Sequence, residues 1–377
     1  MAKDEVIIEP DRIGDAPHPR EATALFGQQA AEDAFLAAWS TGRMHHGWLI
    51  TGPRGVGKAT LAYRIARARL AFEEGDGLFG APEPPTMLDI DPDHPVAHRI
   101  KAMSEPRLFT LRRTANEKTE KLYTQIRVDD VRALKDFFQL SAADGGWRVA
   151  IVDAAEEMNN SAANALLKFL EEPPEKVLIL LISHAPARLL PTIRSRCRTL
   201  ALMPLGAEDL GWALSGAGVE DGADTKALAA LADGSAGEAV RLLEGGGPDL
   251  YTRLVRLTAE APGMNRPEMT AIAEACAGRD AAETYDMTLR LVDVMLSRLA
   301  RAGALGVGQT EAAQGETALM QRLAPDAYAA RIWADLASEV TTKSTRARAV
   351  NLDPAGVILD IFFDIDAAAR KARARAA

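Results

Sequence analysis

A glycine-rich segment near the start of the chain has the composition of a loop that binds phosphate: Gly52-Pro53-Arg54-Gly55-Val56-Gly57-Lys58-Ala59-Thr60. An apolar run over residues 47–51 precedes it and a helical pattern over residues 58–72 follows it, which is the context that such a loop requires. Backbone N–H groups would surround phosphate oxygens, the helix N-terminus would add partial positive charge, and Lys58 would reach the outer phosphates. We therefore expect ATP or ADP to bind here, with an ordinary glycine-rich turn as the alternative. The expected contacts come from Gly52, Pro53, Gly55, Val56, Gly57, Lys58, Ala59 and Thr60.

The residue that follows the lysine departs from the pattern of a phosphate-loop enzyme. That position is usually Ser or Thr, whose hydroxyl ligates Mg²⁺, whereas it is Ala59 here. Thr60 comes one residue later, rotated by about 100° around the helix, and is a poor substitute. We therefore expect Mg²⁺ to bind weakly if at all.

A second apolar run, over residues 148–152, ends in Asp153, where such proteins place a carboxylate linked to Mg²⁺. Many ATPases of this kind follow that aspartate with a glutamate that activates water, but Ala154 follows here, and we expect Glu156 and Glu157 to be displaced from the γ-phosphate. A strand-end or helix-cap aspartate is the alternative for Asp153. With both hydrolytic parts absent, the sequence predicts a degenerate ATPase fold with little turnover of its own.

Strands and helices alternate through about residue 202, which predicts a parallel α/β sheet. Beyond residue 206 the chain is rich in Ala, Leu and Gly and predicts helices only, with Asp353 and Pro354 as the N-cap and first residue of the last one. The expected helices of the first part cover residues 28–40, 58–72, 128–141 and 160–171, and its strands cover 47–51, 148–152 and 177–182.

Composition narrows the class of protein. The chain has 377 residues and a formal net charge of −9, which argues against a general nucleic-acid coat protein. Its two cysteines are too few for a four-cysteine zinc site and make a disulfide framework improbable. The apolar run over residues 177–182 is too short to cross a bilayer, and the first residues lack a signal-peptide core. We expect a cytoplasmic protein with no membrane partner.

Several motifs together resemble the clamp-loader branch of the AAA+ proteins, closest to the stator subunit in bacterial DNA polymerase III. They are residues 153–174 (DAAEEMNNSAANALLKFLEEPP), residues 192–198 (TIRSRCR), Gly27-Gln28, His46 and Gly52–Lys58. The resemblance covers about residues 19–245, and the helical remainder only by its layout. It implies an N-terminal arm (1–24), an AAA+ α/β domain (25–204), a helical lid (205–247) and a helical collar for oligomerisation (248–377). Residues 73–93, acidic and proline-rich, stand where relatives carry a zinc module, so zinc is not expected.

The resemblance gives a role to Ser195-Arg196-Cys197. In clamp loaders this tripeptide places an arginine at a subunit interface, where it reaches the ATP of a neighbouring motor subunit. Arg196 is thereby implied to be an arginine finger acting in trans, and a planar, permanently charged guanidinium suits γ-phosphate oxygens. The residues alone favour a solvated surface arginine, and Cys197 is expected to be a small packing residue.

The implied function is that of a subunit supporting ATP-driven loading of a sliding clamp on primed DNA during replication. The implied partners are gamma/tau motor subunits and a delta subunit, with the clamp and DNA reached through the assembly. The chain would belong to a DNA polymerase (nucleotidyltransferase) complex without independent ATPase activity.

Other classes of function stay open at this stage. A self-sufficient AAA+ motor or helicase loader is disfavoured by Ala59, Ala154 and Gly237, the last standing where motors carry a lid arginine. A metabolic kinase would leave the Ser-Arg-Cys tripeptide unexplained, and a pure DNA-binding module does not fit the net charge. A metal site at His94 and His98 lacks a third ligand. The basic residues of 99–127 are expected to be a solvated face, with nucleic-acid contact as the alternative.

Overall fold

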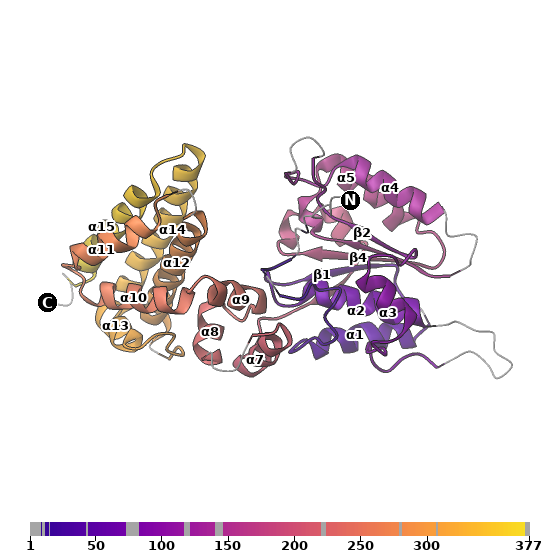
Figure 1. Ribbon diagram of the computed structural model, residues 1–377, viewed down its shortest axis with the longest axis horizontal. Helices are drawn as coiled ribbons and strands as arrows, with labels where there is room; N and C mark the ends of the chain where they lie inside the picture. The colour runs from indigo at the N-terminus through magenta and orange to yellow at the C-terminus, as the bar shows by residue number, and fades with distance from the viewer. Residues whose placement is uncertain are drawn as a thin grey trace, which may run out of the picture. The chain divides into compact units, whose positions relative to one another are not determined.

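The computed structural model describes residues 9, 12–14, 16–42, 44–72, 83–116, 121–139, 146–219, 224–278, 281–306 and 308–373. Contacts divide the chain into two compact units, which are described one at a time (Figure 1). Unit one comprises Met1–Asp221 with Ser235–Gly237, and unit two comprises Gly222–Gly234 with Glu238–Ala377. Part of the acidic segment 73–93, residues 73–82, lies outside the described residues.

Unit one is built on a parallel sheet of five strands, in the order β2-β3-β4-β1-β5. The central strands carry nearly continuous apolar runs because both of their faces are covered by helices. The predicted parallel α/β fold is confirmed, including the three predicted strands, whereas β2 and β5 were missed. The strands are β1 (Gly47–Thr51), β2 (Leu108–Leu111), β3 (Arg148–Val152), β4 (Val177–Ser183) and β5 (Arg198–Ala201).

Helices cover both faces of this sheet (Figure 1). One face packs against α1 (Gln29–Ser40), α2 (Lys58–Ala71) and α3 (Pro95–Lys101), and the other against α4 (Val128–Gln139), α5 (Asn160–Glu171) and α6 (Pro191–Arg194). Unit one also contains α7 (Ala207–Gly216) and the 3₁₀ turns η2 (Ala155–Glu157) and η3 (Pro186–Arg188).

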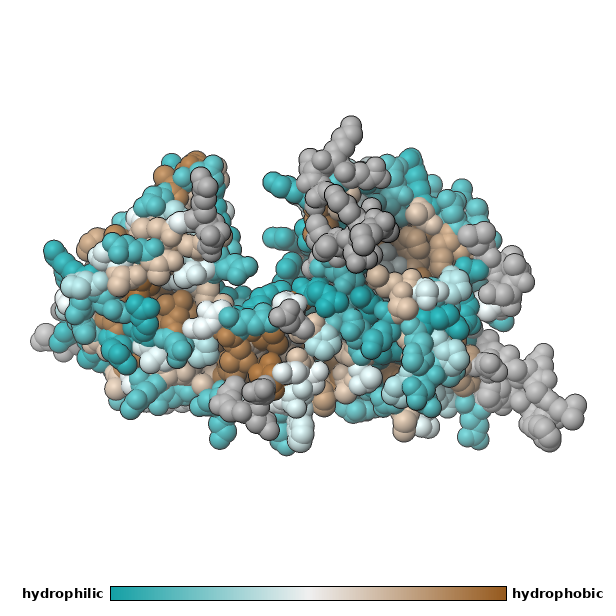
Figure 2. Space-filling model, viewed as in Figure 1, coloured by the Kyte–Doolittle hydropathy of each residue, from teal (hydrophilic) through white to brown (hydrophobic). Residues whose placement is uncertain are grey.

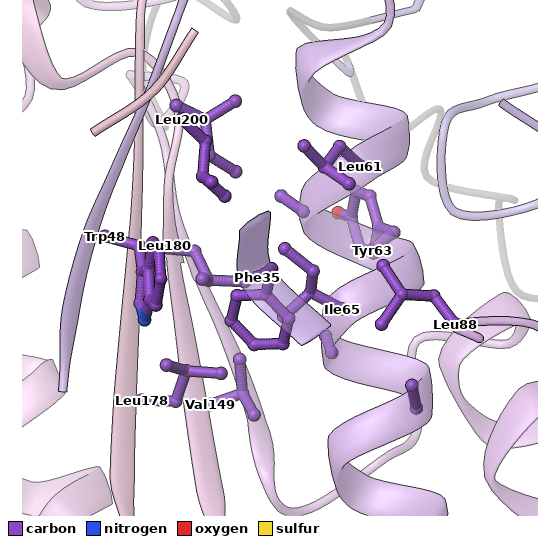
Figure 3. Packing of buried hydrophobic residues seen from close by; sticks show 14 of the residues in the cluster. Phe35, Trp48, Leu61, Tyr63, Ile65, Leu88, Val149, Leu178, Leu180 and Leu200 are labelled. Carbon is purple, nitrogen blue, oxygen red and sulfur yellow. The ribbon is translucent and has the colours of Figure 1, made fainter. Parts of the chain in front are cut away.

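Side chains of β1 alternate between the two cores, as the pleat of a strand requires. Trp48 lies with Phe35 of α1 and Ile65 of α2 in the cluster shown in Figure 3, whereas Leu49 belongs to the cluster on the opposite face. The start of α2, and with it the glycine-rich loop, is thereby fixed against the carboxyl end of β1.

Unit two is helical, as predicted for the second half of the chain. The helices α12 and α14 pack together along their length, and Trp333 is fully buried in the core. The last helix begins as predicted, because Asp353 accepts a hydrogen bond from the backbone N–H of Gly356 at 2.9 Å. The helices are α8 (Thr225–Leu231), α9 (Ala236–Glu244, of which the first two residues belong to unit one), α10 (Gly247–Ala259), α11 (Arg266–Ala275), α12 (Ala282–Leu305), α13 (Glu316–Leu323), α14 (Ala327–Ala349) and α15 (Pro354–Arg373).

Hydrophilic residues cover most of the face of each unit drawn in Figure 2, with smaller hydrophobic patches between them. Within the described ranges, no helix is both long and apolar enough to cross a membrane.

Candidate functional site

The predicted strand–loop–helix context of the glycine-rich segment is present. β1 ends at Thr51 and α2 begins at Lys58. Gly57, the N-cap, has a φ of 99°, and Gly55 has a φ of 72°, a region that other residues enter only with strain. At Gly52 the constraint is also steric, since a Cβ atom there would lie 2.4 Å from the carbonyl oxygen of Leu202. Any other residue at these positions would strain the loop or clash with its neighbours.

Lys58 is held by the carbonyl groups of its own loop. Its side-chain amine donates hydrogen bonds to the carbonyl oxygens of Gly52, at 2.8 Å, and of Pro53. The residue is almost fully buried. Burial lowers the pKa of Lys58 to about 8, although the nearby charges of Asp153 and Glu156 raise it. The amine that we expected to meet an outer phosphate is therefore tied to the loop backbone.

The segment Ser235–Gly237 packs directly on the glycine-rich loop within unit one. The backbone N–H of Gly237 donates to the carbonyl oxygen of Gly55 at 3.1 Å. A Cβ atom on Gly237 would lie 2.6 Å from Cδ1 of Ile13 and 3.2 Å from Cα of Gly55. Gly237 stands where motor subunits are expected to carry an arginine. Here it allows its own backbone to pack closely on that of Gly55.

Polar residues at the carboxyl ends of β3 and β4 lie near Lys58. Glu156 accepts a hydrogen bond from the backbone N–H of His184 at 2.8 Å. Burial and the charge of Lys58 lower the pKa of His184 to about 4 despite the opposing effect of Glu156, so the ring is neutral at neutral pH. The sequence predicts that Glu156 is displaced from a γ-phosphate. The η2 turn after β3 nevertheless brings its charge near enough to raise the pKa of Lys58.

The Ser-Arg-Cys tripeptide connects α6 to β5. One terminal nitrogen of Arg196, Nη1, donates to the carbonyl oxygen of Thr192 at 3.1 Å, and the other, Nη2, lies 2.9 Å from a carboxylate oxygen of Glu171. The Arg196 side chain is still 37% exposed. The Ser195 hydroxyl donates to the same Thr192 carbonyl at 3.1 Å. This segment presents a partly fixed arginine at the surface of unit one.

Cys197 lies against the hydrophobic core between the sheet, α4 and α5. Burial raises the pKa of its thiol to about 12. A thiol that stays protonated is a poor nucleophile, so this environment suits the packing role that the sequence suggests.

The loop and the tripeptide lie at opposite ends of the sheet. β1 and β5 are parallel neighbours, with Trp48 opposite Arg198 and Thr51 opposite Ala201. The loop follows the carboxyl end of β1, whereas Arg196 precedes the amino end of β5. About six residues of strand separate the two positions, or roughly 20 Å at about 3.3 Å per residue. Within unit one, Arg196 therefore does not share a site with the glycine-rich loop.

The remaining candidate sites have local structural explanations. His94 caps α3 by accepting a hydrogen bond from the N–H of Val96, and no three His, Cys, Asp or Glu side chains of the described residues gather where they could hold a metal ion. Arginines of the basic segment form ion pairs with acidic neighbours: Arg99 and Arg107 with Glu105, Arg112 with Glu9, Arg113 with Glu157, and Arg127 with Asp130. These pairs favour an internally neutralised surface over a free basic patch.

Residues 27–206 are similar to one family of known proteins. This segment matches the sequence model of the family described as DNA polymerase III, delta subunit. The chain is 37% identical over 211 residues to the delta' subunit of Pseudomonas aeruginosa, covering 55% of this chain and 59% of that protein. It is 31% identical over 192 residues to the tau subunit of Escherichia coli, covering 51% and 27%. The predicted resemblance to clamp-loader subunits is confirmed over these residues, and the chain spans less than two thirds of the length of these relatives.

Among solved structures, a DNA polymerase III gamma-subunit-related protein from Thermotoga maritima aligns with 17% identity and a TM-score of 0.41. The alignment covers 89% of this chain and all of that one.

Proposed function

We propose that this chain is a clamp-loader subunit of DNA polymerase III, of the delta-prime type, that supplies Arg196 in trans to the ATP site of a neighbouring motor subunit. The observation that carries the proposal is the place of Arg196, at the surface of a family-matched domain and at the end of the sheet opposite its own glycine-rich loop. An arginine at this place cannot reach a phosphate in its own loop, but it is accessible to another subunit.

The physical case for such a role rests on charge. Phosphoryl transfer spreads negative charge over the γ-phosphate oxygens, and a guanidinium can bind two of them at once without being deprotonated. Arginine fingers of this kind raise the rate at their site by about 10³–10⁵-fold.

The chain's own loop has kept its shape while lacking the parts that hydrolysis needs. Ala59 offers no hydroxyl to Mg²⁺, Lys58 is bonded to the loop backbone, and Gly237 packs on Gly55 where a motor would place an arginine. We infer that ATP or ADP at Gly52–Thr60 and Asp153, if held, has a structural role. We assign hydrolysis to the neighbouring subunits.

The proposed assembly follows from the resemblance to clamp-loader subunits. Its other members are gamma/tau motor subunits and a delta subunit, which together would load the sliding clamp on primed DNA in the cytoplasm. We propose an AAA+ domain at 25–204, a lid at 205–247 and a collar at 248–377, with the collar joining the subunits.

The test is ATP turnover by the reconstituted assembly, with clamp and primed DNA, comparing the wild type with Arg196→Ala. The matched control is Arg194→Ala, an exposed arginine two residues away. We expect Arg196→Ala to lower turnover partially, as one of several sites falls silent, while size-exclusion chromatography finds the assembly intact and the control stays unchanged. Unchanged turnover in an intact Arg196→Ala assembly would refute the proposal, and turnover by the isolated chain would favour a self-sufficient motor.

A further inference from the structure

Arg196 is held by a carboxylate that belongs to another element. Glu171 is the last residue of α5, and its Oε1 atom lies 2.9 Å from Nη2 of Arg196. The two side chains are 47% and 37% exposed, so this pair lies at the surface of unit one and can be reached by another protein.

The end of α5 is itself anchored to the sheet. Nε2 of His46, just before β1, lies 2.9 Å from the carbonyl oxygen of Leu170, and since a carbonyl can only accept, the ring nitrogen is the donor. The Leu170 side chain is buried in the core. Glu171 therefore extends from a fixed backbone rather than from a free helix end.

The position of Glu171 is unfavourable for the helix alone. The C-terminus of a helix carries partial negative charge, so an acidic residue there is disfavoured and a basic one is preferred. The guanidinium of Arg196 offsets this cost at Glu171. The neighbouring Glu172, the C-cap, has the same helix environment and is exposed, with no ion pair to the described residues.

We propose that Glu171 is the positioning residue for Arg196, an inference that rests on the proposed function. The guanidinium has five N–H donors. Nη1 donates to Thr192 and Ser195, and Nη2 lies beside Glu171, so Nε and Nη2 keep donors for two phosphate oxygens of a neighbour. Glu171 fixes a long flexible side chain before the subunits meet, so that less conformational entropy is lost on contact.

The test is a double-mutant cycle in the reconstituted assembly. Arg196-dependent turnover is defined as the wild-type rate minus the Arg196→Ala rate. Glu171→Gln removes the charge but keeps the shape, and we expect it to lower this quantity about 1.4- to five-fold, the range of an exposed ion pair. Glu171→Asp should recover part of the loss, Glu172→Gln should have no effect, and the loss should shrink as salt screens the pair.

The cycle separates this proposal from the proposed function. If Arg196→Ala leaves turnover unchanged, the proposed function fails before Glu171 is considered. If Arg196→Ala lowers turnover but Glu171→Gln does not, or raises it, only the positioning role is overturned. A loss from Glu171→Gln that persists in the Arg196→Ala background would also overturn it, because Glu171 would then act independently of the arginine.

Discussion

The contact between the glycine-rich loop and Ser235–Gly237 leads to a prediction with a built-in control. Gly55 and Gly42 both have left-handed backbone conformations, with φ angles of 72° and 66°. A Cβ atom on Gly55 would lie 2.3 Å from the Ser235 hydroxyl oxygen and 3.0 Å from the backbone nitrogen of Gly237. A Cβ atom on Gly42 would have nothing within 4 Å. The two substitutions to alanine therefore share the backbone cost and differ only in the clash.

The expected difference can be worked from these terms. A non-glycine residue in the left-handed region costs about 1–2 kcal/mol, and the lower entropy of an unfolded chain with alanine returns about 0.4–1 kcal/mol. Both terms apply to both positions and cancel. Forcing an extra methyl group into a packed contact costs about 1–3 kcal/mol more, so Gly55→Ala should be less stable than Gly42→Ala by that amount. For a unit of this size the difference corresponds to about 2–12 °C in Tm.

Thermal and urea unfolding followed by tryptophan fluorescence would measure the difference, because four of the five tryptophans belong to unit one. Ser235→Ala should recover part of the loss in the Gly55→Ala background, since the serine hydroxyl is the nearest atom. Equal destabilisation by Gly55→Ala and Gly42→Ala would refute the reasoning, because it would mean that Ser235–Gly237 does not rest on the loop in solution.

Three further predictions concern buried charges and thiols. In the wild type, Nε of the buried Arg298 lies 2.7 Å from Oε1 of Glu316. Glu316→Gln removes this charged partner and should lower the free energy of unfolding of unit two by about 3–5 kcal/mol, as measured in urea. The pKa of Lys58 is about 8 in the folded protein and 10.5 in the unfolded chain, so between these pH values the unfolded chain binds more protons. The stability of the wild type relative to Lys58→Met should therefore rise as the pH increases from about 8 to 10.5. Burial should leave Cys197 and Cys276 slow to react with a thiol reagent at pH 8 until urea is added; fast reaction in the native protein would contradict the structure.

The main elements of unit one could be predicted because their patterns are local. β1 and β3 begin and end where the apolar runs do, and α5 covers the predicted residues, with Asn159 as its N-cap. The edge strands were missed for a physical reason. β5 is largely exposed and begins with two polar residues, Arg198 and Thr199. β2 is only four residues long, contains Thr110 and is mostly half-buried, so neither strand has the continuous apolar run of a central strand.

The sequence indicates which residues belong to the candidate site, but not which contacts those residues make. Sequence spacing predicts roles for Lys58 and Asp153, and the family resemblance predicts one for Arg196. No local pattern indicates that Gly237 bonds to Gly55 or that Glu171 pairs with Arg196. These contacts join positions 25 to 182 residues apart, so they depend on the tertiary fold.

A parallel sheet keeps two parts of one domain far apart. All its strands point the same way, so residues after a strand and residues before its neighbour lie at opposite ends, as Gly52 and Arg196 do across β1 and β5. A change at the loop can therefore weaken the fold without touching the arginine, and a change at the arginine can leave the fold intact. We accordingly expect Gly55→Ala to alter unfolding and Arg196→Ala to alter turnover by the assembly, each with little effect on the other measurement. If Arg196→Ala lowered the unfolding temperature of the isolated chain as much as Gly55→Ala, the arginine would be a structural residue, and its exposure at the surface of unit one would need another explanation.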